Sequence, residues 1–281
     1  MSWYEKPTLF RKVKQNRSYV FVDESGCLTD FKDCFKKALR GDYAPLFRDA
    51  VFSLNAVLIS GKAERKLNRL FRSTILRYLP SDCVLHATDI DSWSGAFNQV
   101  DKEKRQQFSL DLVRLVASSP FIDLSFGMNK RDFFNAAVAQ GCQDAKEVVE
   151  AFYRPVFLEI EKTLCELKRE SATLVMEETT SELDMLILKT YGELKRRRLL
   201  TRCRGMYFSY KGMEDYPAGS ELADITSKSM FAFYRNIELR AFGSHIYNHP
   251  KLKGTGIHYI DYKKPSKRHK RGKTESSKNL D

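Results

Sequence analysis

The sequence predicts a single α/β domain built on a mixed sheet flanked by helices, and three observations support this prediction. Short β-branched and aromatic runs alternate with longer segments of helical spacing along most of the chain. No Pro/Gly/Ser-rich linker divides the chain, so one domain is favoured over two. The 281 residues are 42% hydrophobic, which is enough for a sizeable core. We expect an N-terminal extension at 1–17, a domain at 18–240 and a C-terminal extension with a basic tail at 241–281.

The first half of the predicted domain contains hairpin-like strands. Residues 18–26 (SYVFVDESG) are typical of a buried strand that runs into acidic residues and a glycine turn. Residues 61–79 have apolar side chains at helical spacing, and Pro80 ends this pattern. In this half we expect strands at 18–26, 50–60 and 120–129, helices at 61–79 and 101–118, an irregular or short helical insertion at 27–49 and a loop at 84–97.

The second half alternates strictly between strand and helix. Pro155 lies inside an otherwise helical segment, where we expect a kink or a restart, and Ser181 is a plausible helix cap. In this half we expect helices at 145–170, 181–197 and 220–238, and strands at 171–180 and 203–210.

The positive charge is concentrated near the C-terminus. The chain has 48 basic and 36 acidic residues, a net charge of +12. Residues 263–281 hold eight Lys/Arg against two acidic residues, so 8 − 2 = +6 lies in this tail. We expect the tail to be disordered and to bind polyanions without sequence preference. A pI near 9.3 favours an anionic partner, and nucleic acid is the commonest one.

Three features predict a cytoplasmic protein. The N-terminus has no continuous apolar segment of the kind found in secretory signals. No stretch approaches the roughly 20 apolar residues needed to span a bilayer. The six cysteines are scattered and none form a CxxC pair, which favours reduced, mostly buried thiols.

Acidic residues follow apolar runs at three separate places. Asp23 and Glu24 close the first strand, Glu177 and Glu178 close a later strand, and Asp224 lies one turn into the last helix. Strand ends converge on one edge of an α/β sheet, where ligands bind. Carboxylates gathered there would attract Mg²⁺ or Mn²⁺, and such ions support attack of water on a phosphodiester. The alternative is that these acids are solvated turn residues.

Three segments together resemble a known family. The segments are VFVDESG (20–26), HATDI (86–90) and ELADI (221–225). They are similar to the proteins grouped as domain of unknown function 3800, which are assigned to the ribonuclease H-like superfamily. The resemblance covers roughly residues 18–237, and the DESG opening together with the late LAD helix carries most of it.

The resemblance implies a ribonuclease H-like fold, metal-dependent phosphodiester hydrolysis and a setting in defence against phage or mobile elements. Asp23 matches the aspartate that would bridge the metal ions, and Asp224 matches the acid on the last helix. Glu177 is the best match to the middle carboxylate, with Glu178 as its rival, because alternation along a strand lets only one of them face the site. Glu24 is either a further ligand or a turn residue. Glu221 departs from the family, where Gln is common at this position.

Other candidates surround the acidic residues. His86, three residues before Asp89, would orient water, shuttle a proton or contact phosphate, unless it is structural. Lys211 and Lys228 flank the Asp224 region. Lys228 follows Asp224 by one helical turn and is taken as substrate-binding, with a phosphate as its partner unless it pairs with the Asp224 carboxylate. A basic cluster would bind the phosphate backbone of a nucleic acid, unless it is only a solvated face. The members of this cluster taken as substrate-binding are Arg196, Arg197, Arg198 and Arg202.

The sequence leads to three functional hypotheses. The leading one is a nuclease dependent on Mg²⁺ or Mn²⁺ that hydrolyses RNA or DNA. The second is a non-catalytic nucleic-acid-binding or interaction protein on the same fold. The third is a phosphohydrolase of small molecules, which would need a small closed pocket. The polymer cut, its sequence specificity, the oligomeric state and any regulatory partner are left open.

Overall fold

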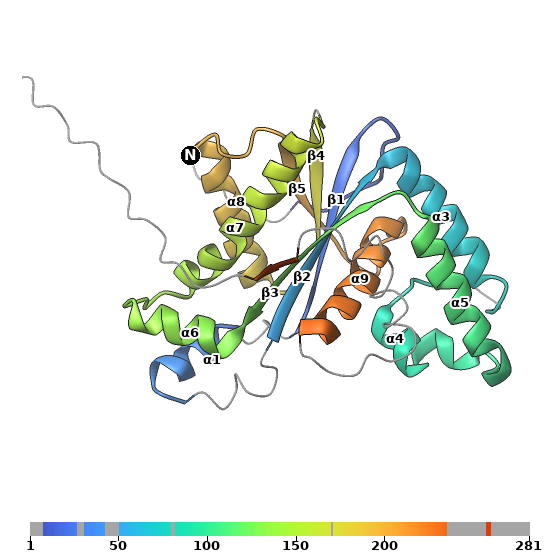
Figure 1. The fold of residues 1–281 in the computed structure, drawn as a ribbon, viewed down its shortest axis with the longest axis horizontal. Coiled ribbons are helices and arrows are strands. Elements are labelled where there is room, and N and C mark those ends of the chain that lie inside the picture. The colour runs from blue at the N-terminus through green and yellow to red at the C-terminus, as the bar shows by residue number, and fades with distance from the viewer. Residues whose placement is uncertain are drawn as a thin grey trace, which may run out of the picture.

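The computed structural model describes residues 8–26, 31–42, 51–79, 82–169, 171–234 and 257–259. These residues form an α/β fold with a six-stranded mixed sheet of order β5-β4-β1-β2-β3-β6, flanked by helices (Figure 1). The fold class predicted from the sequence is therefore confirmed at the level of a mixed sheet flanked by helices.

The strands and helices follow the predicted alternation. The strands are β1 (Ser18–Ser25), β2 (Val51–Ser60), β3 (Ile122–Asn129), β4 (Ala172–Glu177), β5 (Cys203–Ser209) and β6 (Ile257–Tyr259). The helices are α1 (Phe31–Leu39), α3 (Gly61–Ile75), α4 (Ala87–Ser92), α5 (Lys102–Ser118), α6 (Lys130–Ala139), α7 (Ala145–Glu166), α8 (Ser181–Arg196) and α9 (Ala218–Tyr234), with a 3₁₀ turn η1 at Gly95–Gln99.

The pairing of the strands brings three carboxyl ends to one edge. β1 pairs in parallel with β4, and β4 pairs in parallel with β5. β2 is antiparallel to both β1 and β3, with Asp23 opposite Asn55. β6 runs parallel to β3. The carboxyl ends of β1, β4 and β5 therefore meet at the same edge of the sheet, as the sequence predicts.

Helices cover both faces of the sheet and enclose two separate apolar cores. Helices α3, α4, α5 and α9 lie on one side, and α1, α6, α7 and α8 lie on the other (Figure 1). The strand side chains alternate between these cores: Tyr19 and Phe21 pack on the α9 side, whereas Val20 and Val22 pack on the α7 side. We call these the α9 face and the α7 face.

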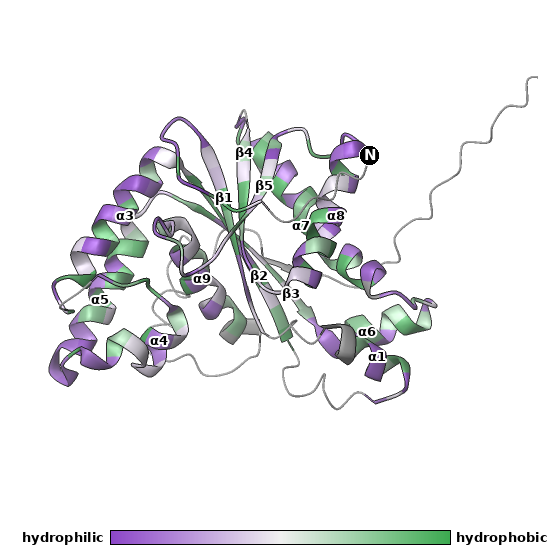
Figure 2. Cartoon of the chain, turned by 180° about the vertical axis from the view of Figure 1, so that it is seen from behind, coloured by the Kyte–Doolittle hydropathy of each residue, from purple (hydrophilic) through white to green (hydrophobic). Residues whose placement is uncertain are grey.

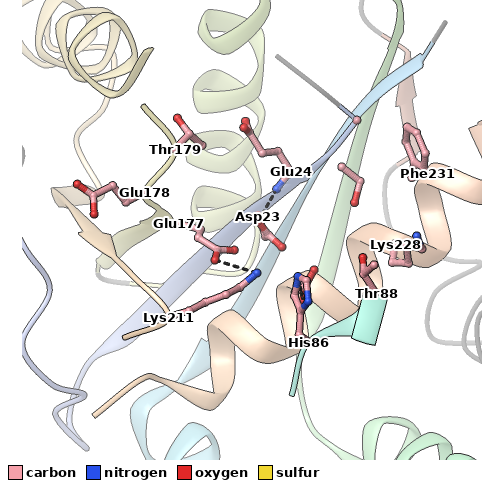
Figure 3. A pocket seen from close by; sticks show the side chains of 13 residues that line it. Asp23, Glu24, His86, Thr88, Glu177, Glu178, Thr179, Lys211, Lys228 and Phe231 are labelled. Atoms are coloured by element: carbon pink, nitrogen blue, oxygen red, sulfur yellow. Dashed lines mark hydrogen bonds and ion pairs between the residues drawn. The ribbon is translucent and has the colours of Figure 1, made fainter. Parts of the chain in front are cut away.

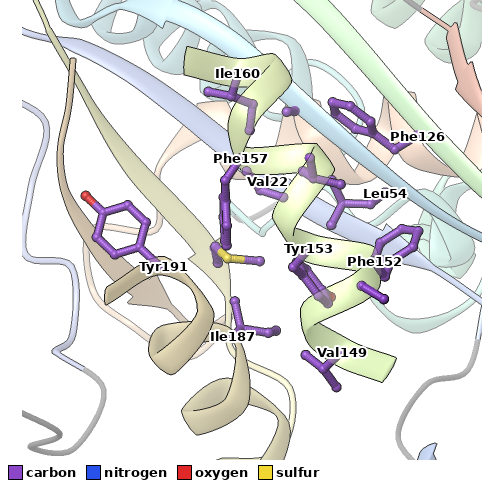
Figure 4. Close-up of a cluster of buried hydrophobic side chains, with 14 of the residues drawn as sticks. Val22, Leu54, Phe126, Val149, Phe152, Tyr153, Phe157, Ile160, Ile187 and Tyr191 are labelled. Carbon is purple, nitrogen blue, oxygen red and sulfur yellow. The ribbon is translucent and has the colours of Figure 1, made fainter. Parts of the chain in front are cut away.

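The helices present their apolar sides to the sheet and their polar sides outward (Figure 2), as amphipathic surface helices do. On the α7 face, Phe152 and Phe157 of α7 and Ile187 of α8 lie over Val22 of β1 (Figure 4). Phe157 and Ile187 are each 1% exposed. Replacing a buried phenylalanine such as Phe157 by alanine would cost about 3–5 kcal/mol of stability.

Four local expectations need correction. The residue that caps helix α8 is Thr180 and not Ser181. The hydroxyl of Thr180 accepts the Leu183 N–H, and Ser181 is already helical. Helix α7 runs unbroken through Pro155. The predicted loop at 84–97 contains α4 and most of η1. Helix α6 was not predicted, since it follows β3 without a polar turn, capped by the Asn129 side chain.

Both extensions contribute residues to the domain. Leu9 bridges to Phe208 of β5, and Phe10 and Val13 are buried in the core of the α9 face. Strand β6 comes from the C-terminal extension. The basic tail at 263–281 lies outside the described residues, as do 27–30 and 43–49 of the predicted insertion. None of the described helices is long and apolar enough to cross a membrane.

Candidate active site

A pocket of about 300 Å³ opens at the carboxyl edge of β1 and β4, beside α9 (Figure 3). Strand ends, the start of α4, the loop after β5 and one side of α9 form its walls. It is lined by Asp23, Glu24, Ser25, Gly26, His86, Thr88, Glu177, Glu178, Thr179, Lys211, Asp224, Lys228 and Phe231.

Strand alternation separates the two acids of the DESG segment. Asp23 shares the parity of Tyr19 and Phe21, so its side chain lies on the α9 face, where it is only 6% exposed. Glu24 has the opposite parity, and its carboxylate accepts a hydrogen bond of 2.9 Å from the hydroxyl of Tyr153 on α7. Asp23 therefore belongs to the carboxylate group beside α9, whereas Glu24 touches the pocket edge but is bound on the α7 face.

The same rule separates Glu177 from Glu178. Glu177 has the parity of Val175, which packs in the core of the α9 face. Its Oε1 lies 3.2 Å from Nζ of Lys211. Glu178 follows the end of β4, and its side chain points away from Asp23 (Figure 3). Of the two rivals, Glu177 is the one directed toward Asp23.

Helix α9 brings Asp224 to these strand ends because it packs very close to the sheet. A Cβ added to Gly219 would lie 2.1 Å from the ring of Phe21, so only glycine permits this approach. Asp224 is 7% exposed, and its Oδ2 accepts the Ala87 N–H at 3.0 Å. We define the carboxylate group as Asp23, Glu177 and Asp224.

The DESG turn is fixed against α9 by its last two residues. The hydroxyl of Ser25 lies 2.9 Å from that of Ser227. Gly26 has φ +96°, and an added Cβ would lie 2.7 Å from the carbonyl oxygen of Val51 and 2.9 Å from the ring of Phe231. Both the backbone conformation and the space require glycine here.

His86 stands between two carboxylates. Its Nδ1 lies 3.3 Å from Oδ2 of Asp89, and its Nε2 lies 3.7 Å from Oδ2 of Asp224. It precedes α4 directly. A proton on either ring nitrogen therefore has a carboxylate nearby, and the imidazole is placed at the pocket wall, where the sequence hypothesis requires it.

A buried ion pair holds the loop that carries His86. Arg72 of α3 binds Glu221 of α9 and also Asp82 at 3.1 Å. The other oxygen of Glu221 accepts the Leu85 N–H at 2.6 Å. Glu221 is fully buried, and the Arg72 guanidinium matches its charge. Sequence reasoning missed Arg72, since 149 positions separate it from Glu221.

The electrostatics of the pocket are dominated by negative charge. Burial raises the pKa of Asp23 well above its ordinary value, and repulsion from Asp224 and Glu177 raises it further. Lys211 is the cation that contacts this group, through Glu177. Burial also raises the pKa of Glu24 to about 7, although the hydrogen bond from Tyr153 lowers it.

The donor chemistry of the pocket fits a hard divalent cation. Asp23, Glu177 and Asp224 supply carboxylate oxygens, the ligands that Mg²⁺ and Mn²⁺ prefer. Among the described residues, no three His, Cys, Asp or Glu side chains stand in an arrangement that would hold a metal ion. The side chains are thus the right kind for a metal site, and in the arrangement observed one member of the carboxylate group, Glu177, is paired with Lys211.

The structure does not bring the basic cluster to the pocket. Arg196, Arg197 and Arg198 are exposed at the end of α8. The carbonyl of Arg202 accepts the Ala172 N–H at the start of β4. Glu177 ends the same strand, and five residues of strand span about 17 Å. The cluster therefore lies at the opposite edge of the sheet, whereas Lys228 lines the pocket as predicted.

Two further residues of the pocket wall, Thr88 and Phe231, are not among the candidates predicted from the sequence. Thr88 lies in α4, and Phe231 lies on α9 beside Gly26. Phe231 shares a helix face with Asp224 and Lys228 at spacings of four and three residues, a pattern that would have found it.

Comparison with known proteins assigns no family, since no protein-family model matches the chain and no curated protein is significantly similar to it.

Proposed function

We propose that the protein is a divalent-metal-dependent nuclease with a ribonuclease H-like fold, akin to the domain of unknown function 3800. One observation carries this proposal: β1, β4 and α9, which are far apart in the sequence, each deliver one carboxylate to a single pocket. The mixed sheet with helices on both faces supports the fold assignment.

The carboxylate group suits a reaction at a phosphodiester. Carboxylates alone would repel a phosphate, so a cation is needed between them. Asp23, Glu177 and Asp224 are the residues that would hold Mg²⁺ or Mn²⁺. When bound, such an ion supplies Lewis-acid polarisation of the phosphate and a more acidic water. Glu24 and Glu178 are left out of this role because their side chains are turned elsewhere.

The remaining pocket residues would act on substrate and water. Lys228 and Lys211 give positive charge at the pocket wall, where a phosphate oxygen would be attracted. His86 lies on the same wall, and its Nε2 faces Asp224 at 3.7 Å. In that place it would orient a water molecule or exchange its proton.

The volume of the pocket favours one alternative, a phosphohydrolase of small phosphate esters. About 300 Å³ is at the lower end of the range for small-molecule sites. Such an enzyme would use the same residues on a nucleotide rather than on a polymer. The two activities differ in substrate and share the carboxylate group.

The test compares Asp23→Asn and Asp224→Asn with wild type and with Glu24→Gln. Labelled RNA, single-stranded DNA, duplex DNA, a hybrid and mononucleotides are each incubated with Mg²⁺ or Mn²⁺. Because metal-assisted hydrolysis rests on several kcal/mol of transition-state stabilisation, we expect both Asn variants to lose at least about 10³-fold in rate. Glu24→Gln is the matched control, since it removes the neighbouring carboxylate on the other face.

Each outcome has a definite reading. Cleavage of a polymer by wild type and Glu24→Gln, but not by the Asn variants, supports the nuclease. Turnover of mononucleotides alone supports the phosphohydrolase. Binding of nucleic acid without cleavage by wild type overturns both, and leaves a non-catalytic binding protein.

A further inference from the structure

Lys211 contacts the carboxylate group of the pocket. The proposed reaction gives this lysine a role toward a phosphate, but it does not say what the lysine does before a metal ion binds. Lys211 follows β5 by two residues, so it emerges at the same sheet edge as Glu177, which pairs with Ser209. Its ammonium is directed at the Glu177 carboxylate (Figure 3), with Nζ 3.2 Å from Oε1. The Glu177 side chain is 14% exposed and that of Lys211 is 39% exposed.

The lysine interacts with the whole carboxylate group and not with Glu177 alone. Burial disfavours its charge, but attraction to the three carboxylates, Asp224 foremost, outweighs this and raises the pKa of Lys211 above its usual value. Conversely, Lys211 lowers the pKa of Asp23, against the larger effects of burial and of the other two acids. Because Lys211 lines the same pocket as all three carboxylates and contacts Glu177, its ammonium is a counter-charge placed beside the group.

The way Lys211 is mounted leaves it able to move. It lies in a turn between β5 and α9, where the Met213 N–H donates to the carbonyl of Tyr210 at 3.0 Å. A lysine carries a compact charge on a flexible four-carbon stem. The ammonium can thus leave Glu177 without any change in the strands or in α9, where the three carboxylates are fixed.

We propose that Lys211 is an internal counter-cation: its ammonium offsets part of the negative charge of the carboxylate group in the metal-free protein and gives way when a divalent cation binds there. This inference rests on the proposed function, because it assumes that the same carboxylates bind the metal ion. Binding of the metal is then an exchange of cations. The protein accordingly loses metal affinity in return for a stable metal-free fold.

The test measures Mn²⁺ binding by titration calorimetry, without substrate, in wild type, Lys211→Met and Lys66→Met. Lys66 is exposed on α3, so its variant removes the same charge away from the pocket. Because a competing charge a few ångströms away is removed, we expect Lys211→Met to bind Mn²⁺ about tenfold tighter or more, and Lys66→Met to match wild type. In thermal unfolding, metal-free Lys211→Met should melt below wild type and gain more from Mn²⁺.

Lys211→Arg guards against a variant that fails to fold. A guanidinium keeps the charge and binds a carboxylate through a planar fork, so it should be harder to displace and weaken Mn²⁺ binding. Mn²⁺ affinity of Lys211→Met equal to or below that of wild type overturns the proposal. If wild type nevertheless binds Mn²⁺ and Asp23→Asn does not, the carboxylates still bind the metal ion, and only the role of Lys211 is wrong. If no variant binds Mn²⁺, the proposed function falls as well.

Discussion

At the carboxyl edge of β1 and β4, the two faces of the sheet hold their carboxylates in different ways. On the α7 face, Glu24 accepts a hydrogen bond from Tyr153, and Asp184 accepts the N–H and hydroxyl of Thr179 at 3.2 and 2.8 Å. Each of these carboxylates is bound by its own neutral donors. On the α9 face, Asp23, Glu177 and Asp224 gather around a pocket and share one lysine.

This difference shows how a strand assigns roles to adjacent residues. Asp23 and Glu24 are neighbours in the sequence, yet successive side chains of a strand point to opposite faces. The carboxylates of Glu24 and Asp184 each accept hydrogen bonds from neutral groups of the α7 face, which hold them in place within the fold. Carboxylates that are grouped and desolvated raise one another's pKa, and a cation relieves them. The α9 face is therefore the face of this edge on which we place the proposed chemistry.

The sharpest test of the comparison substitutes, one at a time, the two adjacent glutamates at the end of β4, Glu177 and Glu178. We expect Glu177→Gln to lower the rate of phosphodiester hydrolysis by about 10³-fold, because it removes one of three carboxylates of a metal-assisted reaction. Glu178→Gln should stay within about twofold, since an exposed side chain turned from the site contributes little. Single-turnover assays with Mn²⁺ measure both. Equal losses would show that the parity of β4 does not sort these two residues.

A second prediction concerns Asp123, a carboxylate on the α9 face away from the pocket. It is 2% exposed, and Asn55 Nδ2 donates to it at 2.9 and 3.1 Å. Burial raises its pKa from 3.8 to about 7, although hydrogen bonds from Asn55 and Thr226 lower it. The folded state thus holds the Asp123 proton more tightly than the unfolded chain does. The contribution of Asp123 to the free energy of unfolding is therefore fully present below pH 4 and is lost as the pH rises toward 7.

Replacing Asp123 by Asn should remove that part of the pH dependence. The loss between pH 4 and pH 7 amounts to about 2–4 kcal/mol in wild type, from 1.36 kcal/mol per pKa unit. Urea unfolding at several pH values gives the free energy of unfolding for both proteins. Because other buried acids such as Glu64 also have a raised pKa, the measured quantity is the difference in slope between the two. Parallel curves would contradict the prediction.

A third prediction compares two buried glutamates that anchor loops at opposite edges of the sheet. Glu221 binds Arg72 and the Leu85 N–H beside the pocket. Glu161 of α7 accepts the Thr201 and Arg202 N–H groups, both at 2.8 Å, at the far edge. We expect Glu221→Gln to lower kcat about tenfold by loosening the His86 loop, a typical effect of a supporting residue.

Glu161→Gln is the matched control for loss of a buried anchor. Both variants should lose about 1–3 kcal/mol of stability, since each weakens hydrogen bonds to a charged acceptor. Only Glu221→Gln should change kcat and the pH profile of the folded enzyme, with KM nearly constant. An equal fall of kcat in both would mean that stability, rather than the position of His86, sets the rate.

Much of this architecture is predictable from local patterns. The β1 strand is a short β-branched and aromatic run, and the α9 segment has apolar residues at helical spacing. Asp23 near the end of β1 and Asp224 within α9 mark the edge of the sheet. The choice between Glu177 and Glu178 needs tertiary information, because parity gives a face only once the position of α9 is known. Arg72 and Glu221 meet across 149 positions, and no spacing rule predicts such a pair. Ribonuclease H-like ancestry and the bound metal stay predictions.

The prediction that the basic cluster lies near the acidic residues is wrong, and the order of the elements in the sequence already argues against it. Arg202 precedes β5, whereas Glu177 ends β4, and the two strands are parallel. The rule that gathers strand ends at one edge also puts strand starts at the other. Applied to Arg202, it would have separated the cluster from the acids.

The smallest expected effect sharpens this separation of the two edges. Arg197→Gln combined with Arg198→Gln removes two exposed charges at the end of α8. We assign them to the opposite edge of the sheet from Glu177, and the length of β4, about 17 Å, separates the two edges. A dinucleotide in the pocket cannot span that distance, so its hydrolysis should stay within about twofold, as for surface changes generally. Binding of a long single strand should lose up to about 0.7 per arginine from its slope against log salt concentration, if the cluster contacts phosphates. Fluorescence anisotropy at several salt concentrations measures the slope. An unchanged slope would make the cluster a solvated face, and a slower dinucleotide reaction would break the assignment of the two edges.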